Sequence, residues 1–195
     1  MKKKGEVNRH PVKKFPIVAA CGLDCGLCPR FYTEGPSRCP GCAGPGFFTK
    51  HPTCSFITCC VRQKGFEVCA ECSEFPCPKF KTGAEYSRMN ESSSYPSCRK
   101  ILPNLFFIKR HGIAQFIRRQ RARMRMLKVM IAEYNDGRSR SFFCRAAVFL
   151  ESASLHASML KAGKLIQERG IRKNDMKSRA TILRSVLLPL LPSED

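Results

Sequence analysis

Cysteine spacing constrains this chain more than any other feature of its sequence. Eleven of the thirteen cysteines lie between residues 21 and 77, and six of them form C-x2-C pairs. The pairs are Cys25/Cys28, Cys39/Cys42 and Cys69/Cys72. A C-x2-C turn sets two thiolates close enough to share one metal ion, and two such turns complete a tetrahedral four-cysteine site. We therefore expect residues 15–81 to form a small metal-stabilised module of loops, knuckles and short helices with little β structure.

Two kinds of metal centre are compatible with these spacings. Cys39-Pro-Gly-Cys42 carries the Pro and Gly typical of zinc knuckles, so zinc is the expected cofactor. The alternative is an iron–sulfur cluster, because one loop carries C-x3-C-x2-C and Cys77-Pro78 supplies a remote Cys-Pro. Radical-SAM enzymes also use the C-x3-C-x2-C spacing. They need a barrel of alternating strands and helices, whereas only helical patterns follow here.

Disulfide bonds would require export, which the N-terminal segment does not predict. The apolar run before the first cysteine spans only Phe15 to Ala20 and is interrupted by Pro16, whereas a signal-peptide core needs roughly 7–15 apolar residues. No stretch approaches the ~20 apolar residues of a membrane span. We therefore expect a cytoplasmic protein without a membrane part, in which dense cysteines serve as metal ligands. Cys98 and Cys144 lie outside the dense region and are interpreted as core residues.

The rest of the chain divides by composition. Residues 1–14 are predicted to be a basic flexible tail, residues 82–98 a polar linker and residues 99–195 an α-helical region. Apolar residues at helical spacing predict five helices. Their expected ranges are 101–110, 113–134, 142–151, 154–170 and 174–188. Ser141 and Asn174 are the expected caps of the third and fifth helices, and residues 15–20 are expected to form one short strand.

Positive charge is concentrated away from the cysteines. The net charge is +20, with +5 in residues 1–20, +1 in residues 21–98 and +14 in residues 99–195. Six cations cluster on the expected helix 113–134, and these are Arg118, Arg119, Arg121, Arg123, Arg125 and Lys128. Like charges one helical turn apart cost stability, so residues 118–128 indicate an anionic partner, either nucleic acid or an acidic protein. The alternative is a solvated helix face, or arginines that pair with acidic groups elsewhere in the fold.

No nucleophile and base are paired in a way that predicts catalysis, so the pattern favours a binding protein over an enzyme. Catalysis by a reactive cysteine that binds no metal stays an open alternative. The four histidines, His10, His51, His111 and His156, are scattered. His51 precedes Cys54 by three residues and is either a ligand or a loop histidine. No catalytic residue is assigned.

Four motifs occur in a specific order along the cysteine region. They are CGLDCGLCP from Cys21, CPGC from Cys39, C-x4-C from Cys54 and KGFEVCAECSEFPCPKF from Lys64. This order resembles the prokaryotic domain-of-unknown-function family 3795. The later segment EYNDGRSRSFFCRAA from Glu133 is similar to the turn and helix of longer members. The resemblance covers roughly residues 17–150.

The resemblance implies a metal-binding protein whose biochemical role is not established, and it brings no catalytic residues. It places the metal ligands at ten positions, which are Cys21, Cys25, Cys28, Cys39, Cys42, Cys54, Cys59, Cys69, Cys72 and Cys77. Cys60 departs from the pattern, so the choice between Cys59 and Cys60 stays open. Ten ligands exceed the eight of two four-cysteine sites, so either some are not ligands or a third or shared site exists.

The expected function is a binding or scaffold module built on structural zinc. The first alternative is electron transfer or redox sensing through an iron–sulfur cluster. The second is nucleic-acid binding through the basic helical half.

Overall fold

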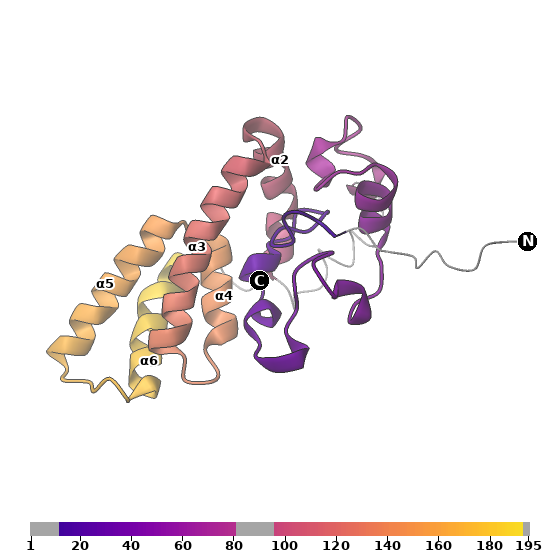
Figure 1. Cartoon of the computed structure of the whole chain (residues 1–195). Coiled ribbons are helices and arrows are strands. Elements are labelled where there is room, and N and C mark those ends of the chain that lie inside the picture. Colours follow the sequence, from indigo (N-terminus) through magenta and orange to yellow (C-terminus); the bar gives the residue numbers. More distant parts are fainter. Residues whose placement is uncertain (1–11, 81–95, 193–195) are drawn as a thin grey trace, which may run out of the picture.

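The computed structural model describes residues 12–80 and 96–192, and no strand occurs within these ranges. A cysteine-rich part made of loops and short helical turns lies beside a bundle of longer helices (Figure 1). This arrangement confirms the expected fold class. The expected tail and linker, residues 1–14 and 82–98, fall largely outside the described residues.

The cysteine-rich part is built from seven short helices. They are η1 (Cys25–Leu27), η2 (Pro29–Tyr32), η3 (Gly35–Ser37), η4 (Phe47–Thr49), η5 (Ile57–Gln63), η6 (Cys69–Glu71) and η7 (Pro78–Phe80). All are 3-10 turns except η5, which is a π-helix. Proline lies in the first turn of η2, η3 and η7, where its fixed φ and missing N–H fit a helix start.

The strand expected over residues 15–20 is absent, and these residues form turns. Their backbone groups bond to the cysteine loops instead of to a neighbouring strand. The N–H of Gly26 donates to the carbonyl of Ile17 at 2.7 Å, and the N–H of Cys42 donates to the carbonyl of Pro16 at 2.9 Å. Residues 15–20 therefore form the centre around which two cysteine loops are wrapped.

Five longer helices follow a short 3-10 turn, η8 (Pro96–Lys100). They are α2 (Ile101–His111), α3 (Ile113–Tyr134), α4 (Arg140–Phe149), α5 (Ser152–Glu168) and α6 (Met176–Leu187), and the 3-10 turn η9 (Leu188–Leu190) ends the described chain. The predicted helices are thus confirmed to within about two residues. Within the described ranges, no helix has the length and apolarity needed to cross a lipid bilayer.

The helix caps differ from those expected. The residue that precedes α4 is Ser139 rather than Ser141, and it makes no side-chain capping bond. Before α6, the carboxylate of Asp175 rather than Asn174 accepts the N–H of Ser178 at 3.1 Å. The predicted turn between α3 and α4 is confirmed, because the Asp136 carboxylate accepts the N–H groups of residues 138 and 139.

Two hydrophobic clusters make up the core, and each crosses the boundary between the two parts. The first joins the cysteine-rich part, including Val18, Val68 and Phe80, to Leu105 of α2 and Phe116 of α3. The second is the interior of the helix bundle, and it includes Leu27 of η1. The cysteine-rich part is therefore packed on α2, α3 and α4 rather than attached through the linker alone.

Candidate metal centre

The first cysteine group consists of Cys21, Cys25, Cys42 and Cys54. Cys21 lies close enough to Cys42 and Cys54 for their sulfurs to raise its pKa. The pKa of Cys25 is raised in the same way by the sulfurs of Cys42 and Cys21. Cys21 and Cys42 are buried, and the other two are half-buried. Three segments that are separate in sequence thus bring their sulfurs to one place.

Backbone N–H groups lie against these sulfurs. The N–H of Leu23 bonds to the sulfur of Cys21, that of residue 42 to the sulfur of Cys25, and that of Ala20 to the sulfur of Cys42. Hydrogen bonds of this kind stabilise thiolate, and each lowers the pKa of the cysteine that receives it. Such N–H donors to sulfur are a feature expected of metal-binding knuckles.

Two glycines allow the loops to approach this closely. Gly41 has φ +87°, and a Cβ there would lie 2.3 Å from the carbonyl oxygen of Pro16. Gly22 has φ +95°, and its Cβ would lie 2.7 Å from Cγ of Leu105 in α2. Only glycine fits both the backbone conformation and the space at these two positions.

Burial is the largest influence on the pKa values of Cys21, Cys25 and Cys42. It raises the pKa of Cys21 to about 12 and the pKa values of Cys25 and Cys42 above their usual range. These thiols are therefore neutral at pH 7 unless a positive charge replaces their protons, and a bound metal ion does this. Lys13 acts in the same direction, since its charge lowers the pKa of all three.

The second cysteine group consists of Cys59, Cys60, Cys69, Cys72 and Cys77. All five line one hollow. The hollow is completed by Phe56, Lys64, Glu74, Phe75, Lys79 and Phe80. It is formed by η5, η6 and η7, so its sulfurs come from three short helices and the turns beside them.

Two specific contacts order the second group. The thiol of Cys69 hydrogen-bonds to the sulfur of Cys60, and this bond lowers the pKa of Cys60 and raises that of Cys69. The ammonium of Lys64 donates to Sγ of Cys72 at 3.2 Å and pairs with the carboxylate of Glu74 at 2.6 Å. A lysine thus lies close to the second group, as Lys13 does to the first.

The donor chemistry fits a thiophilic metal, but the side chains do not form a closed ligand set. Among residues 12–80 and 96–192, no three cysteine, histidine or carboxylate side chains stand close enough together to hold an ion. A cysteine sulfur moves between positions by rotation about one bond, χ1. Which sulfurs would close around a metal is therefore part of the proposal below.

Two of the ten predicted ligands, Cys28 and Cys39, belong to neither group. The sulfur of Cys28 lies near Cys144 of α4 and raises its pKa. Cys39 is half-buried, and its N–H donates to the carbonyl of Arg30 at 2.9 Å. Cys144 is 1% exposed and belongs to the bundle core, as the sequence predicted. His51 stacks on the ring of Phe47 with centroids 4.7 Å apart.

The sequence leaves the choice between Cys59 and Cys60 open, and it does not predict that two lysines lie beside the cysteine groups. Cys60 contacts Cys69 and lines the hollow, which Cys59 also lines. Lys13 was assigned to the flexible tail, yet it is 3% exposed. Lys64 was read only as part of a motif. The single available signal was the adjacency of Cys59 and Cys60 in a segment rich in ligands.

The predicted cations of α3 do not share one surface. Arg118, Arg121, Arg125 and Lys128 are exposed, and their spacing places them along one face of the helix. Arg119 lies over the ring of Phe107, with 4.4 Å between its guanidinium carbon and the ring centroid, and it pairs with Glu151.

Arg123 is buried and lies apart from that exposed face. Its Nη2 is 3.6 Å from Oδ1 of Asp24, and its Nη1 donates to the carbonyl of Val148 at 3.2 Å. It shares a helix face with buried Gln120 and Leu127, and that face packs on the rest of the protein. Arg123 therefore contributes to the interior rather than to a surface for a polyanion.

Comparison with known proteins finds one family model that matches part of this chain. The model of a family described as "Protein of unknown function (DUF3795)" matches residues 17–82. This confirms the resemblance for the segment that holds both cysteine groups, while residues 83–150 lie outside the match. Searches of curated proteins and of solved structures gave no match.

Proposed function

We propose that this chain is a metal-binding protein in which two groups of cysteines each hold a metal ion, with zinc as the metal. The observation that carries the proposal is the convergence of sulfurs that are distant in sequence. The sulfur of Cys21 lies near those of Cys42 and Cys54, and the thiol of Cys69 bonds to the sulfur of Cys60. Thiols gathered in this way suit metal binding, and in a reducing compartment they would not form disulfides.

Each group supplies enough sulfurs for one tetrahedral site. Cys21, Cys25, Cys42 and Cys54 would hold the first ion. The second ion would take four of the five cysteines that line the hollow, with Cys60 and Cys69 among them. Four sulfurs and no open position are typical of a structural zinc site, whose role is to stabilise the fold.

The architecture supports a scaffolding role for these sites. The cysteine-rich part has short helices and loops, and its apolar residues share a cluster with α2. In such modules the free energy of metal binding is also free energy of folding. We infer that the metal holds the surface of the cysteine-rich part in shape for binding a partner.

Iron–sulfur chemistry is the alternative for the second group. The hollow is lined by five cysteines and by aromatic rings, and five sulfurs are more than one zinc ion needs. A cluster bound there would supply one-electron redox chemistry, with its potential set by the surrounding charges and burial. The residues that would tune it are Lys64 and Glu74.

Metal analysis of the full chain, purified without oxygen, tests the proposal. We expect colourless protein with about two zinc ions per chain, and loss of about one ion in each of Cys42→Ser and Cys69→Ser. Cys144→Ser is the matched control, because this cysteine lies in the bundle core. Brown protein that contains iron and acid-labile sulfide would show that the chain holds an iron–sulfur cluster rather than zinc. Protein without any metal and with every thiol reactive would contradict metal binding altogether.

We propose nucleic-acid binding through α3 as a second candidate function. It is favoured by the exposed stripe of Arg118, Arg121, Arg125 and Lys128, which has no carboxylate at ion-pair distance among the described residues. Basic side chains in a row along one helix face suit a phosphate backbone. An acidic protein is the other partner for the same surface.

A further inference from the structure

Lys13 is a buried cation without a carboxylate partner in the described parts of the chain. Its side chain is 3% exposed, and its ammonium donates to the carbonyl oxygen of Val18 at 2.5 Å. The ion pairs of the described residues involve other cations, namely Lys64, Arg119, Arg123 and Arg179. Because burying an ammonium is costly unless negative charge compensates it, the surroundings of Lys13 must supply that charge.

Lys13 bonds to the chain beside two cysteines, through the carbonyl of Val18 before Cys21 and the carbonyl of Ala43 after Cys42. Its charge acts on the sulfurs of Cys21, Cys25, Cys42 and Cys60, and it lowers the pKa of each. Three of these belong to the first group and one to the second. The charge of Lys13 therefore lies near sulfurs of both groups and favours their thiolate forms.

The backbone beside Lys13 also joins the two groups. The N–H of Lys13 donates to the carbonyl of Ala43 at 3.0 Å, directly after Cys42. The next two N–H groups, of Lys14 and Phe15, donate to the carboxylate of Glu67 at 2.7 and 2.9 Å, just before Cys69. This short segment is thus held by a loop of each group.

We propose that Lys13 is the counter-charge of an anionic thiolate centre. The inference rests on the proposed metal-binding function and specifies its chemistry. Four thiolates around a divalent ion keep a formal charge of about −2, and the Lys13 ammonium compensates part of it inside the protein. A buried ammonium fits a site of four cysteines, which carries a net negative charge. Each neutral histidine in place of a cysteine would remove one negative charge from the site.

Replacing Lys13 by methionine removes the charge and keeps the length of the side chain. We expect Lys13→Met to lose zinc to an excess chelator with an apparent affinity roughly 10- to 100-fold below that of the wild type, as for other residues that support metal ligands. Lys14→Met is the matched control, because Lys14 is exposed. Release of zinc is followed with a chromogenic chelator, and helix content by circular dichroism shows whether the bundle is intact. Equal zinc affinity in Lys13→Met and the wild type would overturn the inference.

Two further variants separate charge from hydrogen bonding and from folding. Lys13→Gln keeps a donor for the Val18 carbonyl without the charge, and we expect it to lose zinc as Lys13→Met does. Lys13→Arg keeps the charge, and we expect it to fold and to hold zinc even if both neutral variants fail to fold. If Lys13→Gln holds zinc like the wild type, or if Lys13→Arg folds but loses zinc as the neutral variants do, the positive charge does not support the site and the inference is wrong. Wild-type protein that binds no metal would overturn both the proposed function and this inference. Wild-type protein that binds zinc, with Lys13→Gln binding it equally well, would overturn this inference alone.

Discussion

The carboxylate of Asp24 accepts a hydrogen bond of 2.9 Å from Nε2 of Gln120, although 96 residues separate them. The other carboxylate oxygen accepts a bond of 2.9 Å from Nδ2 of Asn104 in α2, and Arg123 of α3 lies 3.6 Å away. All four side chains are buried. Since Asp24 immediately precedes Cys25, this network fixes the first cysteine loop to two helices of the bundle.

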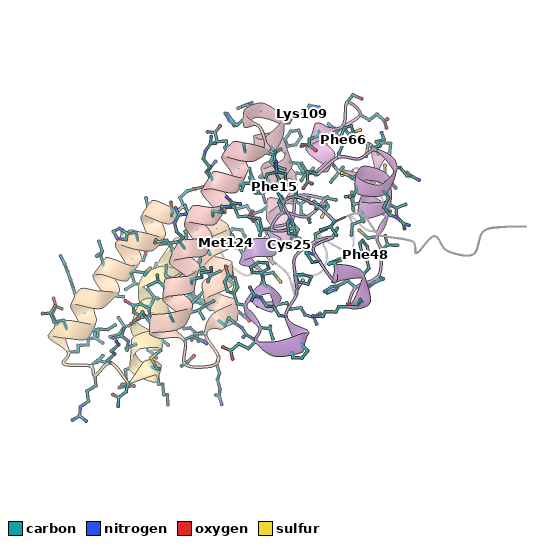
Figure 2. The ribbon with its side chains drawn as sticks, viewed as in Figure 1. Phe15, Cys25, Phe48, Phe66, Lys109 and Met124 are labelled. Atoms are coloured by element: carbon teal, nitrogen blue, oxygen red, sulfur yellow. The ribbon has the colours of Figure 1, made fainter. Side chains whose placement is uncertain are left out.

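The same junction is supported by a further hydrogen bond and by the packing of α3 on η1. Gln120 also donates to the carbonyl of Ile17 at 3.0 Å. Met124, one turn further along α3, packs against η1, and a Cβ at Gly26 would lie 2.8 Å from its sulfur. Figure 2 labels Met124 and Cys25 at this junction. The position of the first cysteine group is therefore set by α3 as much as by its own loop.

Removing the Asp24 carboxylate should destabilise the protein strongly. We expect Asp24→Ala to lower the free energy of unfolding by about 3–5 kcal/mol, because it leaves the Arg123 guanidinium buried without its anion. The double variant Asp24→Ala/Arg123→Met should recover part of this loss. Denaturant unfolding followed by circular dichroism measures both. Arg119→Met breaks the exposed pair with Glu151 and should cost less than about 1 kcal/mol; a similar small cost for Asp24→Ala would contradict the role given to this network.

Gly41→Ala should disrupt the first cysteine group. A Cβ at this position would overlap the carbonyl oxygen of Pro16, 2.3 Å away, so the loop that carries Cys42 must shift. Gly46 is the control, because it also has positive φ but nothing lies within 4 Å of its Cβ position. We expect Gly46→Ala to cost only the roughly 1–2 kcal/mol of a left-handed backbone, and Gly41→Ala in addition to lower the zinc content. Equal effects of the two changes would show that close approach to Pro16 is unimportant.

Cys60, rather than Cys59, should be required for metal at the second group. Cys60 is buried and hydrogen-bonded to Cys69, whereas Cys59 is half-buried. We expect Cys60→Ser to lower the metal content by about one ion per chain and Cys59→Ser to leave it nearly unchanged. Metal analysis of the two purified variants, with Cys144→Ser alongside, decides between them. Loss of metal in Cys59→Ser but not in Cys60→Ser would show that Cys59, which the family pattern assigns, is the ligand.

Metal removal should loosen α2 together with the cysteine-rich part. Leu105 and Ile108 of α2 belong to the same apolar cluster as Val18 and Val68, and α2 packs against η6. Hydrogen exchange measured by mass spectrometry should therefore show faster exchange in residues 15–80 and in α2 after chelation. We expect α5 and α6 to be unaffected, because they belong to the other cluster. Uniform loss of protection would mean that the chain unfolds as one unit.

The exposed stripe of α3 should bind polyanions in a salt-dependent way. We expect Arg121→Gln/Arg125→Gln to flatten the slope of log affinity against log salt by up to about two units on duplex DNA, since each phosphate contact contributes about −0.9. The loss should be similar for all sequences, because phosphate contacts do not read bases. Fluorescence anisotropy with labelled DNA at increasing KCl measures the slope. Arg119→Gln, on another face, is the control. Absence of binding at low salt would leave an acidic protein as the partner.

The helical half could be predicted well because its signals are local. Gly112, with φ +82°, separates α2 from α3 at the residue where the sequence ends one helix and begins the next. The Asp136 turn between α3 and α4 depends on bonds to residues two and three positions ahead. The caps were harder to predict, since Asn174 and Asp175 are both suitable and only the final helix geometry selects Asp175.

The cysteine spacing likewise predicts metal-type knuckles, because two sulfurs three residues apart are brought together by the turn itself. It does not predict how the knuckles combine. Cys42 joins Cys21 and Cys25, whereas Cys28 lies near Cys144 in the bundle.

The sequence allows the arginines of residues 118–125 to pair with acidic groups elsewhere in the fold, but it does not show which basic residue is buried or what its partner is. Lys13 and Arg123 belong to residue types that are usually exposed, and each lies in a run of basic residues that resembles a solvated surface. They are buried because partners distant in sequence surround them, which are the sulfurs of Cys21 and Cys42 for Lys13 and the carboxylate of Asp24 for Arg123. Backbone bonds and side-chain periodicity act over a few residues, so the sequence suffices for helices and knuckles. The pairing of charges across tens of residues depends on packing, so it is found only in the folded chain.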